Sequence, residues 1–225
     1  MFHLMMAFLA FARCASGLSA SLSVGAPPVR AAATSSGRVG TVLIRNTQRT
    51  VPIDVDALES ATRALLGRLR CGDFDVGIWL TSDATIRKLN TQFRGKRKST
   101  DILSFPFHDE HEAGALPDCV DRSEEDELNL GDMVVSVPYV LRRALRDGGR
   151  PDDSGHRGVA AAMAPVEDVE ERVQMLLVHG LCHLLNYDHE TEEDFESMVA
   201  LEEDLLETLR EWRAARRRRA AAGGS

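Results

Sequence analysis

The sequence lacks paired cysteines and long apolar runs. Its four cysteines, Cys14, Cys71, Cys119 and Cys182, are scattered, and no two of them form a CxxC pair. This spacing argues against a disulfide framework and indicates a reducing compartment. No apolar run is long enough to cross a bilayer, so we expect no membrane-spanning helix and no membrane partner.

Acidic residues are missing from the start of the chain. None precedes Asp54, although the first forty residues hold three arginines. Residues 4–12 form a short apolar stretch, and a Ser/Ala-rich region follows it. These features predict that residues 1–40 are a cleaved targeting segment rather than a disordered tail. A secretory signal does not suit the unpaired cysteines, so we expect an organellar protein, with the chloroplast stroma favoured over the mitochondrion.

The rest of the chain is acidic. The formal net charge is −8, and without the first forty residues 24 Lys and Arg stand against 35 Asp and Glu, a net charge of −11. Bulk charge therefore does not indicate nucleic-acid binding, and any such binding requires a local basic patch. The sequence offers one such patch within the predicted domain, Arg94 with Lys96, Arg97 and Lys98, and the C-terminal arginines, Arg213 and those at 216–219, either form a solvated tail or add to RNA attraction.

The hydrophobic pattern predicts one α/β domain over residues 41–210, a small mixed β-sheet packed with helices. Pro106 indicates that the third strand has a free edge. We expect surface insertions near 108–128 and 148–164, and a basic disordered tail over 211–225. The predicted strands are 40–46, 74–80, 102–107 and 133–137, and the predicted helices are 55–70, 81–93, 138–147, 166–185 and one that begins after Thr191.

Three of the seven histidines lie within eleven residues. If 166–185 is a helix, His179 and His183 are at positions i and i+4 and leave the same face. His189 follows after a segment that must turn back. Two nitrogens one helical turn apart and a third from the next turn suit one zinc ion per chain, with an open fourth position as in catalytic sites. The sequence therefore predicts a zincin-like metal helix.

The spacing of the three histidines equals that of the metzincin proteases, HExxHxxGxxH. Those enzymes place a general-base glutamate after the first histidine, where this chain has Gly180. A peptidase that depends on this base would not work in the same way here.

Three sequence blocks resemble the YbeY endoribonucleases, the ribosomal RNA maturation factors. HGLCHLLNYDH at 179–189 is similar to the family's HGxLHLxGYDH, residues 90–106 to its N-x-x-F-R…T-D-V-L-S-F-P block, and residues 130–136 to its LGDIVIS. The resemblance implies a zinc-dependent endoribonuclease that cleaves single-stranded RNA. It further implies small-subunit ribosomal RNA and the ribosome as partners, with His179, His183 and His189 as metal ligands and catalytic residues.

Two positions depart from the family pattern. Asn186 stands where the family has glycine, and we expect the turn to survive because asparagine tolerates a positive φ. Cys182 replaces a leucine. It is either a small core residue or a fourth metal ligand, and ligation would close the site.

The remaining candidates surround the predicted metal. Arg94 is the candidate to bind the scissile phosphate, against the alternative of a surface salt bridge. Lys96, Arg97 and Lys98 either follow the RNA backbone or form a solvated charge run. Asp188 either orients a ligand imidazole or caps the turn.

No residue is an obvious general base. Two routes stay open: zinc-bound hydroxide as the nucleophile, or attack by a ribose 2′-hydroxyl beside a polarised phosphate. Two other functions compete with the nuclease, namely a zinc peptidase and a non-catalytic ribosome assembly factor that zinc only stabilises.

Overall fold

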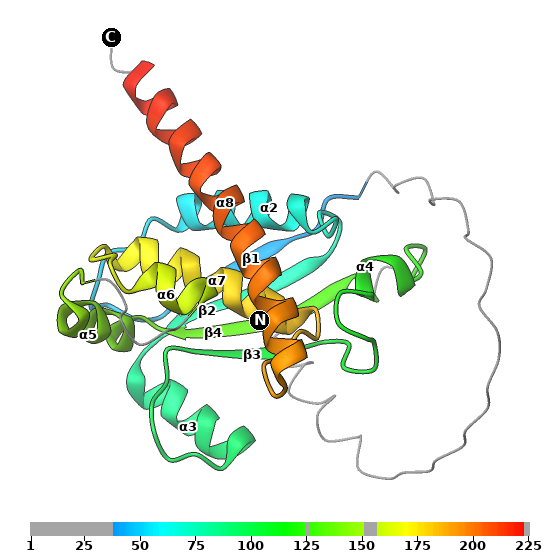
Figure 1. Cartoon of the computed structure of the whole chain (residues 1–225), viewed down its shortest axis with the longest axis horizontal. Coiled ribbons are helices and arrows are strands. Elements are labelled where there is room, and N and C mark those ends of the chain that lie inside the picture. The colour runs from blue at the N-terminus through cyan, green and yellow to red at the C-terminus, as the bar shows by residue number, and fades with distance from the viewer. Residues whose placement is uncertain (1–37, 125–126, 151–156, 223–225) are drawn as a thin grey trace.

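A four-stranded mixed sheet forms the centre of the fold (Figure 1). The computed structural model describes residues 38–124, 127–150 and 157–222. The strand order is β1-β2-β4-β3, in which β1, β2 and β4 are parallel and β3 is antiparallel to β4. This confirms the predicted mixed sheet and places β3, with Pro106, at a free edge. The strands are β1 (Val42–Asn46), β2 (Asp75–Thr81), β3 (Ile102–Pro106) and β4 (Asn129–Ser136).

The two faces of the sheet carry cores of different size. Alternate residues of a strand point to opposite faces. Ile102 and Met133 therefore join the main core, whereas Leu103 and Val134 pack with Ile86 in a small second cluster. The main core lies beneath α2, α7 and α8, and the small one lies beneath α3.

Most helices begin where the sequence indicates, with one correction. Asp54 and Ser82 accept hydrogen bonds from the first turns of α2 and α3 as N-caps. The metal helix begins later than predicted, at Val169, because Asp168 accepts from the backbone amide of Glu171 and acts as the N-cap. The helices are α2 (Val55–Arg68), α3 (Asp83–Arg94), α4 (Leu116–Cys119), α5 (Val137–Asp147), α6 (Gly158–Met163), α7 (Val169–Leu184) and α8 (Glu192–Ala222).

Helix α7 lies very close to the sheet at Gly180. A Cβ atom at this position would stand 2.4 Å from Met133 Sδ and 2.8 Å from Ile102 Cδ1. These side chains come from β4 and β3, so the glycine faces the sheet and leaves no room for a side chain. His179, the first histidine of the predicted site, comes directly before Gly180. The close contact therefore sets how far the histidines lie above the sheet.

The two predicted surface insertions are partly buried, which corrects the sequence interpretation. Within 108–128, Leu116 and Leu128 are fully buried and belong to the main core. Within the described part of 148–164, Val159 and Met163 of α6 are buried. The apolar residues in these segments are isolated among polar ones and show no hydrophobic period. Their burial could therefore not be predicted from the sequence pattern.

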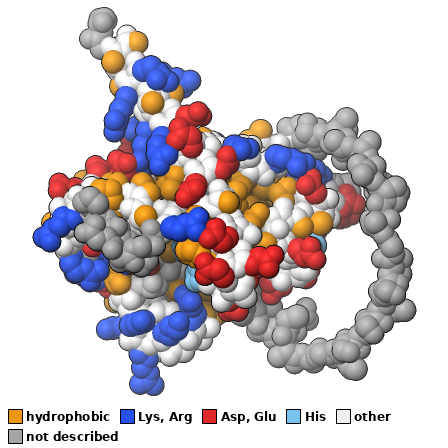
Figure 2. All heavy atoms as spheres, in the orientation of Figure 1, with side chains coloured by type: hydrophobic (Ala, Val, Ile, Leu, Met, Phe, Trp, Pro, Cys, Tyr) orange, Lys and Arg blue, Asp and Glu red, His pale blue; other side chains and the backbone are white. Residues whose placement is uncertain are grey.

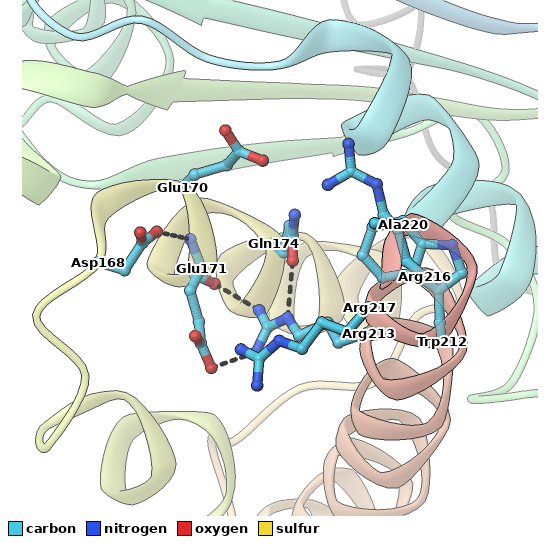
Figure 3. Close-up of a pocket in the computed structure, with 9 residues that line it drawn as sticks. All are labelled: Asp168, Glu170, Glu171, Gln174, Trp212, Arg213, Arg216, Arg217 and Ala220. Carbon is cyan, nitrogen blue, oxygen red and sulfur yellow. Dashed lines mark hydrogen bonds and ion pairs between the residues drawn. The ribbon is translucent and has the colours of Figure 1, made fainter. Parts of the chain in front are cut away.

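The prediction of a disordered tail from residue 211 is wrong for 211–222, which continue α8. Figure 1 shows the last turns of α8 extending beyond the rest of the described chain. The first of these turns is held by α7, as Figure 3 shows: Arg213 pairs with Glu171 and donates to Gln174 Oε1 at 2.9 Å. Arg216 pairs with Asp54 at 2.6 Å. These ion pairs hold the first part of the segment to the rest of the chain, and its alanines and arginines are themselves strong helix formers.

Two predictions concern membranes and targeting. None of the helices in the described ranges combines the length and the apolar content that a bilayer span requires. Residues 1–37 of the predicted targeting segment lie outside the described residues.

Candidate metal centre

The fold brings the three predicted histidines together. His179 and His183 leave the same face of α7, and His189 returns from the turn before α8. One ring nitrogen from each lies within 4.8 Å of the others. The Nε2 atoms of His179 and His183 are 3.2 Å apart. The spacing predicted from the sequence is thus present in three dimensions.

The Nδ1 atoms of His179 and His183, which lie away from the cluster, have hydrogen-bond partners. His183 Nδ1 lies 2.9 Å from the carbonyl oxygen of Tyr187, and His179 Nδ1 lies 2.7 Å from Glu202 Oε1. A carbonyl only accepts, so the Nδ1 atom of His183 carries the proton, and the carboxylate favours the same tautomer in His179. Both Nε2 atoms then present lone pairs toward His189.

The donor set fits a metal ion. Two Nε2 lone pairs that face each other at 3.2 Å repel unless a cation lies near both. Ligands about 2 Å from a tetrahedral zinc ion are about 3.3 Å apart, which agrees with this spacing. A hydrogen bond from each ligand's other nitrogen to a carbonyl or carboxylate is the usual outer arrangement of metal-binding histidines. His179, His183 and His189 are therefore compatible with a metal.

The local electrostatics keep His183 neutral. Burial, followed by the neighbouring rings of His179 and His189, lowers the pKa of His183 to about 4. Metal binding requires the neutral imidazole. Near neutral pH, protons therefore do not compete with a cation for this nitrogen.

The turn after α7 adopts the backbone expected from the sequence. Asn186 has φ 65°, the left-handed conformation that asparagine tolerates in place of glycine. Asp188 Oδ1 accepts from the backbone amide of His189 at 2.7 Å and lies 3.8 Å from its ring nitrogen Nδ1. Of the two predicted roles for Asp188, this geometry favours fixing the turn.

Cys182 points away from the histidines and into the main core. It is fully buried, and its sulfur is not among the donor atoms that lie within reach of the cluster in the described chain. Burial raises the pKa of its thiol well above the ordinary range, which opposes the thiolate form that binds metal. The structure favours the core role over ligation.

The histidines open into a cleft of about 620 Å³ that Arg94 also lines. Arg94 is the last residue of α3, and Gly95 ends that helix in the left-handed conformation. Among the described residues no ion pair engages its guanidinium. The surface salt bridge weighed from the sequence is therefore not found, and the charge is free to meet an anion in the cleft.

Lys96, Arg97 and Lys98 do not line this cleft. Arg97 instead lies with Arg87 and Lys88 around a shallow hollow beside α3. Figure 2 shows basic side chains gathered at the lower end of the view, over α3. Arg94 therefore lines the histidine cleft, whereas Arg87, Lys88 and Arg97 form a basic surface next to it.

Sequence reasoning missed two residues of the site. Glu202 reaches His179 from α8, 23 positions along the chain, and His111 lines the cleft from the segment after β3. Glu202 looks like any helical glutamate in a run of acids, so no local signal marks it. His111 carries a weak signal, because it is one of two histidines in the acidic stretch 108–112.

We expect Glu202→Gln to weaken metal binding by about 10- to 100-fold. Glu202 accepts from His179 through Oε1 and from the backbone amide of Val159 through Oε2 at 2.8 Å, and an amide side chain satisfies only one of these donors. Zinc titration against a competing chelator measures the change. Glu203→Gln, at the next and exposed position, is the matched control. Equal affinities in both variants would show that Glu202 does not support the site.

The fold and the cleft define an α/β protein whose histidine cluster is compatible with a metal ion. Residues 43–210 match the family model described as Endoribonuclease YbeY, and the chain belongs to this family. Proteins with this name are similar to it: one from Homo sapiens is 30% identical, covering 75% of this chain and 87% of that one. One from Persephonella marina is 32% identical, covering 69% and 83%.

A solved structure, the solution structure of a Thermotoga maritima protein, also matches. It is 22% identical, with a TM-score of 0.48 over 78% of this chain and 93% of that one.

Proposed function

We propose that the chain is a zinc-dependent endoribonuclease that cleaves single-stranded RNA during ribosomal RNA processing. The observation that carries the proposal is one cleft that contains both the histidine cluster and Arg94, whose guanidinium has no ion pair among the described residues. Family membership supplies the reaction class, since the relatives bear the name endoribonuclease.

Each residue has a role that follows from its position. His179, His183 and His189 would hold zinc, and Glu202 and the Tyr187 carbonyl set the tautomers of His179 and His183. When bound, zinc supplies Lewis-acid polarisation of a phosphoryl oxygen or of water. Arg94 binds the non-bridging phosphate oxygens bidentately and stabilises the charge that grows on them.

The cleft favours single strands on electrostatic and geometric grounds. Phe93, Phe105 and the edge strand β3 line it, and partly buried aromatic residues beside an open strand edge suit unstacked bases. The basic surface of Arg87, Lys88 and Arg97 beside it would follow the phosphate backbone. This local surface provides the attraction that the acidic body lacks.

We expect Arg94→Ala to lower the cleavage rate of single-stranded RNA by about 100-fold or more while zinc content stays unchanged. Arg97→Ala, outside the cleft, is the matched control. It should mainly weaken RNA binding and reduce the salt dependence of affinity by about one phosphate contact. Cleavage of end-labelled single-stranded and duplex RNA, with zinc quantified alongside, measures both. Equal losses of cleavage rate in the two variants would show that Arg94 has no specific role in the reaction.

The same assay decides between catalysis and a non-catalytic assembly role. Folded wild-type protein with one zinc at the histidines and no cleavage of any RNA would favour the assembly factor. A peptidase is disfavoured, because Gly180 faces the sheet and leaves no room for the missing base.

The proposal extends to partners and location. Small-subunit ribosomal RNA within the ribosome is the proposed substrate, and the family resemblance supports it. The arginine-bearing, acid-free start of the chain supports import into an organelle, the plastid ahead of the mitochondrion.

A further inference from the structure

A second group of metal-binding side chains lies in the segment after β3. His108, Glu110 and His111 each offer a donor atom, and the three atoms lie within 4.8 Å of one another. Both His108 Nδ1 and His111 Nε2 lie 3.4 Å from Glu110 Oε1. These separations match the spacing of about 3.3 Å between ligands of a tetrahedral zinc ion.

The hydrogen bonds of His108 leave a lone pair facing carboxylates. Its side chain is 4% exposed, and Nε2 lies 2.8 Å from the backbone carbonyl of Glu127, which only accepts. The ring proton is therefore on Nε2, and neutral His108 directs the lone pair of Nδ1 at Glu110 Oε1. A cation bound between these two acceptors would satisfy both, in the place that a second ring proton takes in an ion pair. The bond to a backbone carbonyl is also the usual outer contact of a metal-binding histidine.

The carboxylates complete the ligand set. The other oxygen of Glu110, Oε2, accepts from the backbone amide of Asp109 at 3.1 Å, which leaves Oε1 for the histidines. Glu127 Oε2 lies 3.8 Å from His108 Nδ1, close enough to approach an ion bound there. Two imidazoles and two carboxylates balance the charge of a divalent cation and favour zinc over magnesium or calcium.

We propose that His108, Glu110 and His111, with Glu127 as fourth ligand, form a second binding site for a divalent transition metal of the zinc class. The site is separate from the three-histidine cluster but is connected to it. The carbonyl oxygen of His111 accepts from Asn186 Nδ2 at 3.0 Å, and the backbone amide of Gly114 donates to the carbonyl of Leu185 at 2.9 Å. The segment after β3 lines the cleft and is bonded to the turn that carries His189. An ion bound here therefore holds that segment in place against the turn.

Zinc stoichiometry of the full chain tests the proposal. Protein stripped with a chelator, reloaded with zinc and freed of loose metal by gel filtration should hold two equivalents. Glu110→Gln and His111→Asn change exposed or half-exposed side chains and should each hold one. Glu112→Gln, an exposed glutamate outside the donor set, is the matched control and should hold two.

Variants of the first site separate the two predictions. His189→Ala should hold one equivalent, and His189→Ala with Glu110→Gln should hold none. If the double variant holds none but His189→Ala alone keeps the wild-type content, the second site stands and the first fails.

Two results would overturn the second site: wild-type content in both Glu110→Gln and His111→Asn, or one equivalent in the wild type and none in His189→Ala. The cluster would then be an ion pair between a protonated His108 and Glu110. Circular dichroism confirms that each variant is folded.

Discussion

We expect His183→Ala to abolish zinc binding at the histidine cluster and to lower RNA cleavage by at least about 100-fold, while the chain stays folded. The expected size follows from zinc supplying several kcal/mol of transition-state stabilisation, at about 1.4 kcal/mol per factor of ten. The fold is expected to persist because His183 is only half-buried and its ring faces the cleft rather than the main core. Zinc content, cleavage rate and circular dichroism are measured on the same preparation.

The thermal transition gives an independent reading. Zinc at about 1,000 times its dissociation constant stabilises a binding protein by about 4 kcal/mol. The zinc-dependent rise in the melting temperature should therefore shrink in His183→Ala. Cys182→Ala, at the neighbouring buried position, is the matched control and should keep both zinc and cleavage. Unchanged cleavage in His183→Ala would mean that the observed activity belongs to a contaminant.

Gly180→Glu, which supplies the glutamate of the protease motif, should destabilise the chain by more than about 3 kcal/mol and produce no peptidase. The carboxylate would enter the contact between α7 and the sheet, where even a Cβ meets Met133 and Ile102 below 3 Å. Overpacking a core costs about 1–3 kcal/mol, and burying an unpaired charge adds to it. Denaturant unfolding measures the loss.

Gly67→Glu controls for the residue change itself. Gly67 lies in α2, and a Cβ there meets no atom within 4 Å. This variant should gain up to about 1 kcal/mol, because glycine is a poor helix former. Gly180→Ala should fall between the two, with a smaller loss than the glutamate. Wild-type stability in Gly180→Glu would contradict the close packing of α7 on the sheet.

The sequence predicted the local parts of the site with good accuracy. The i, i+4 spacing of His179 and His183 fixes a shared helix face wherever that helix packs, because the period of a helix is a local property. Asn186 marks its own left-handed turn for the same reason. The apolar segments likewise located all four strands, although β4 begins four residues before its predicted start, and Pro106 identified the edge strand.

The errors have different physical causes. The extension of α8 through residue 222 accompanies ion pairs of Arg213 and Arg216 with residues far earlier in the chain. Leu116 and Leu128 are buried because the fold offers space beneath them, not because their segment shows a hydrophobic period. The late start of α7 has a local cause, because Asp168 accepts from the backbone amide of Glu171 and caps the helix three residues after the predicted start.

The sequence by itself determined the four strands, five of the described helices, the three histidines and the family, since each depends on residue types at short spacings. Only the tertiary structure decided which side chains meet across long separations. It brought Glu202 to His179 and Arg94 to the histidine cleft, and it turned Gly180 from a missing base into a required close contact. The reason is that periodicity specifies which face of an element is buried, whereas the partner of that face depends on how all elements pack together.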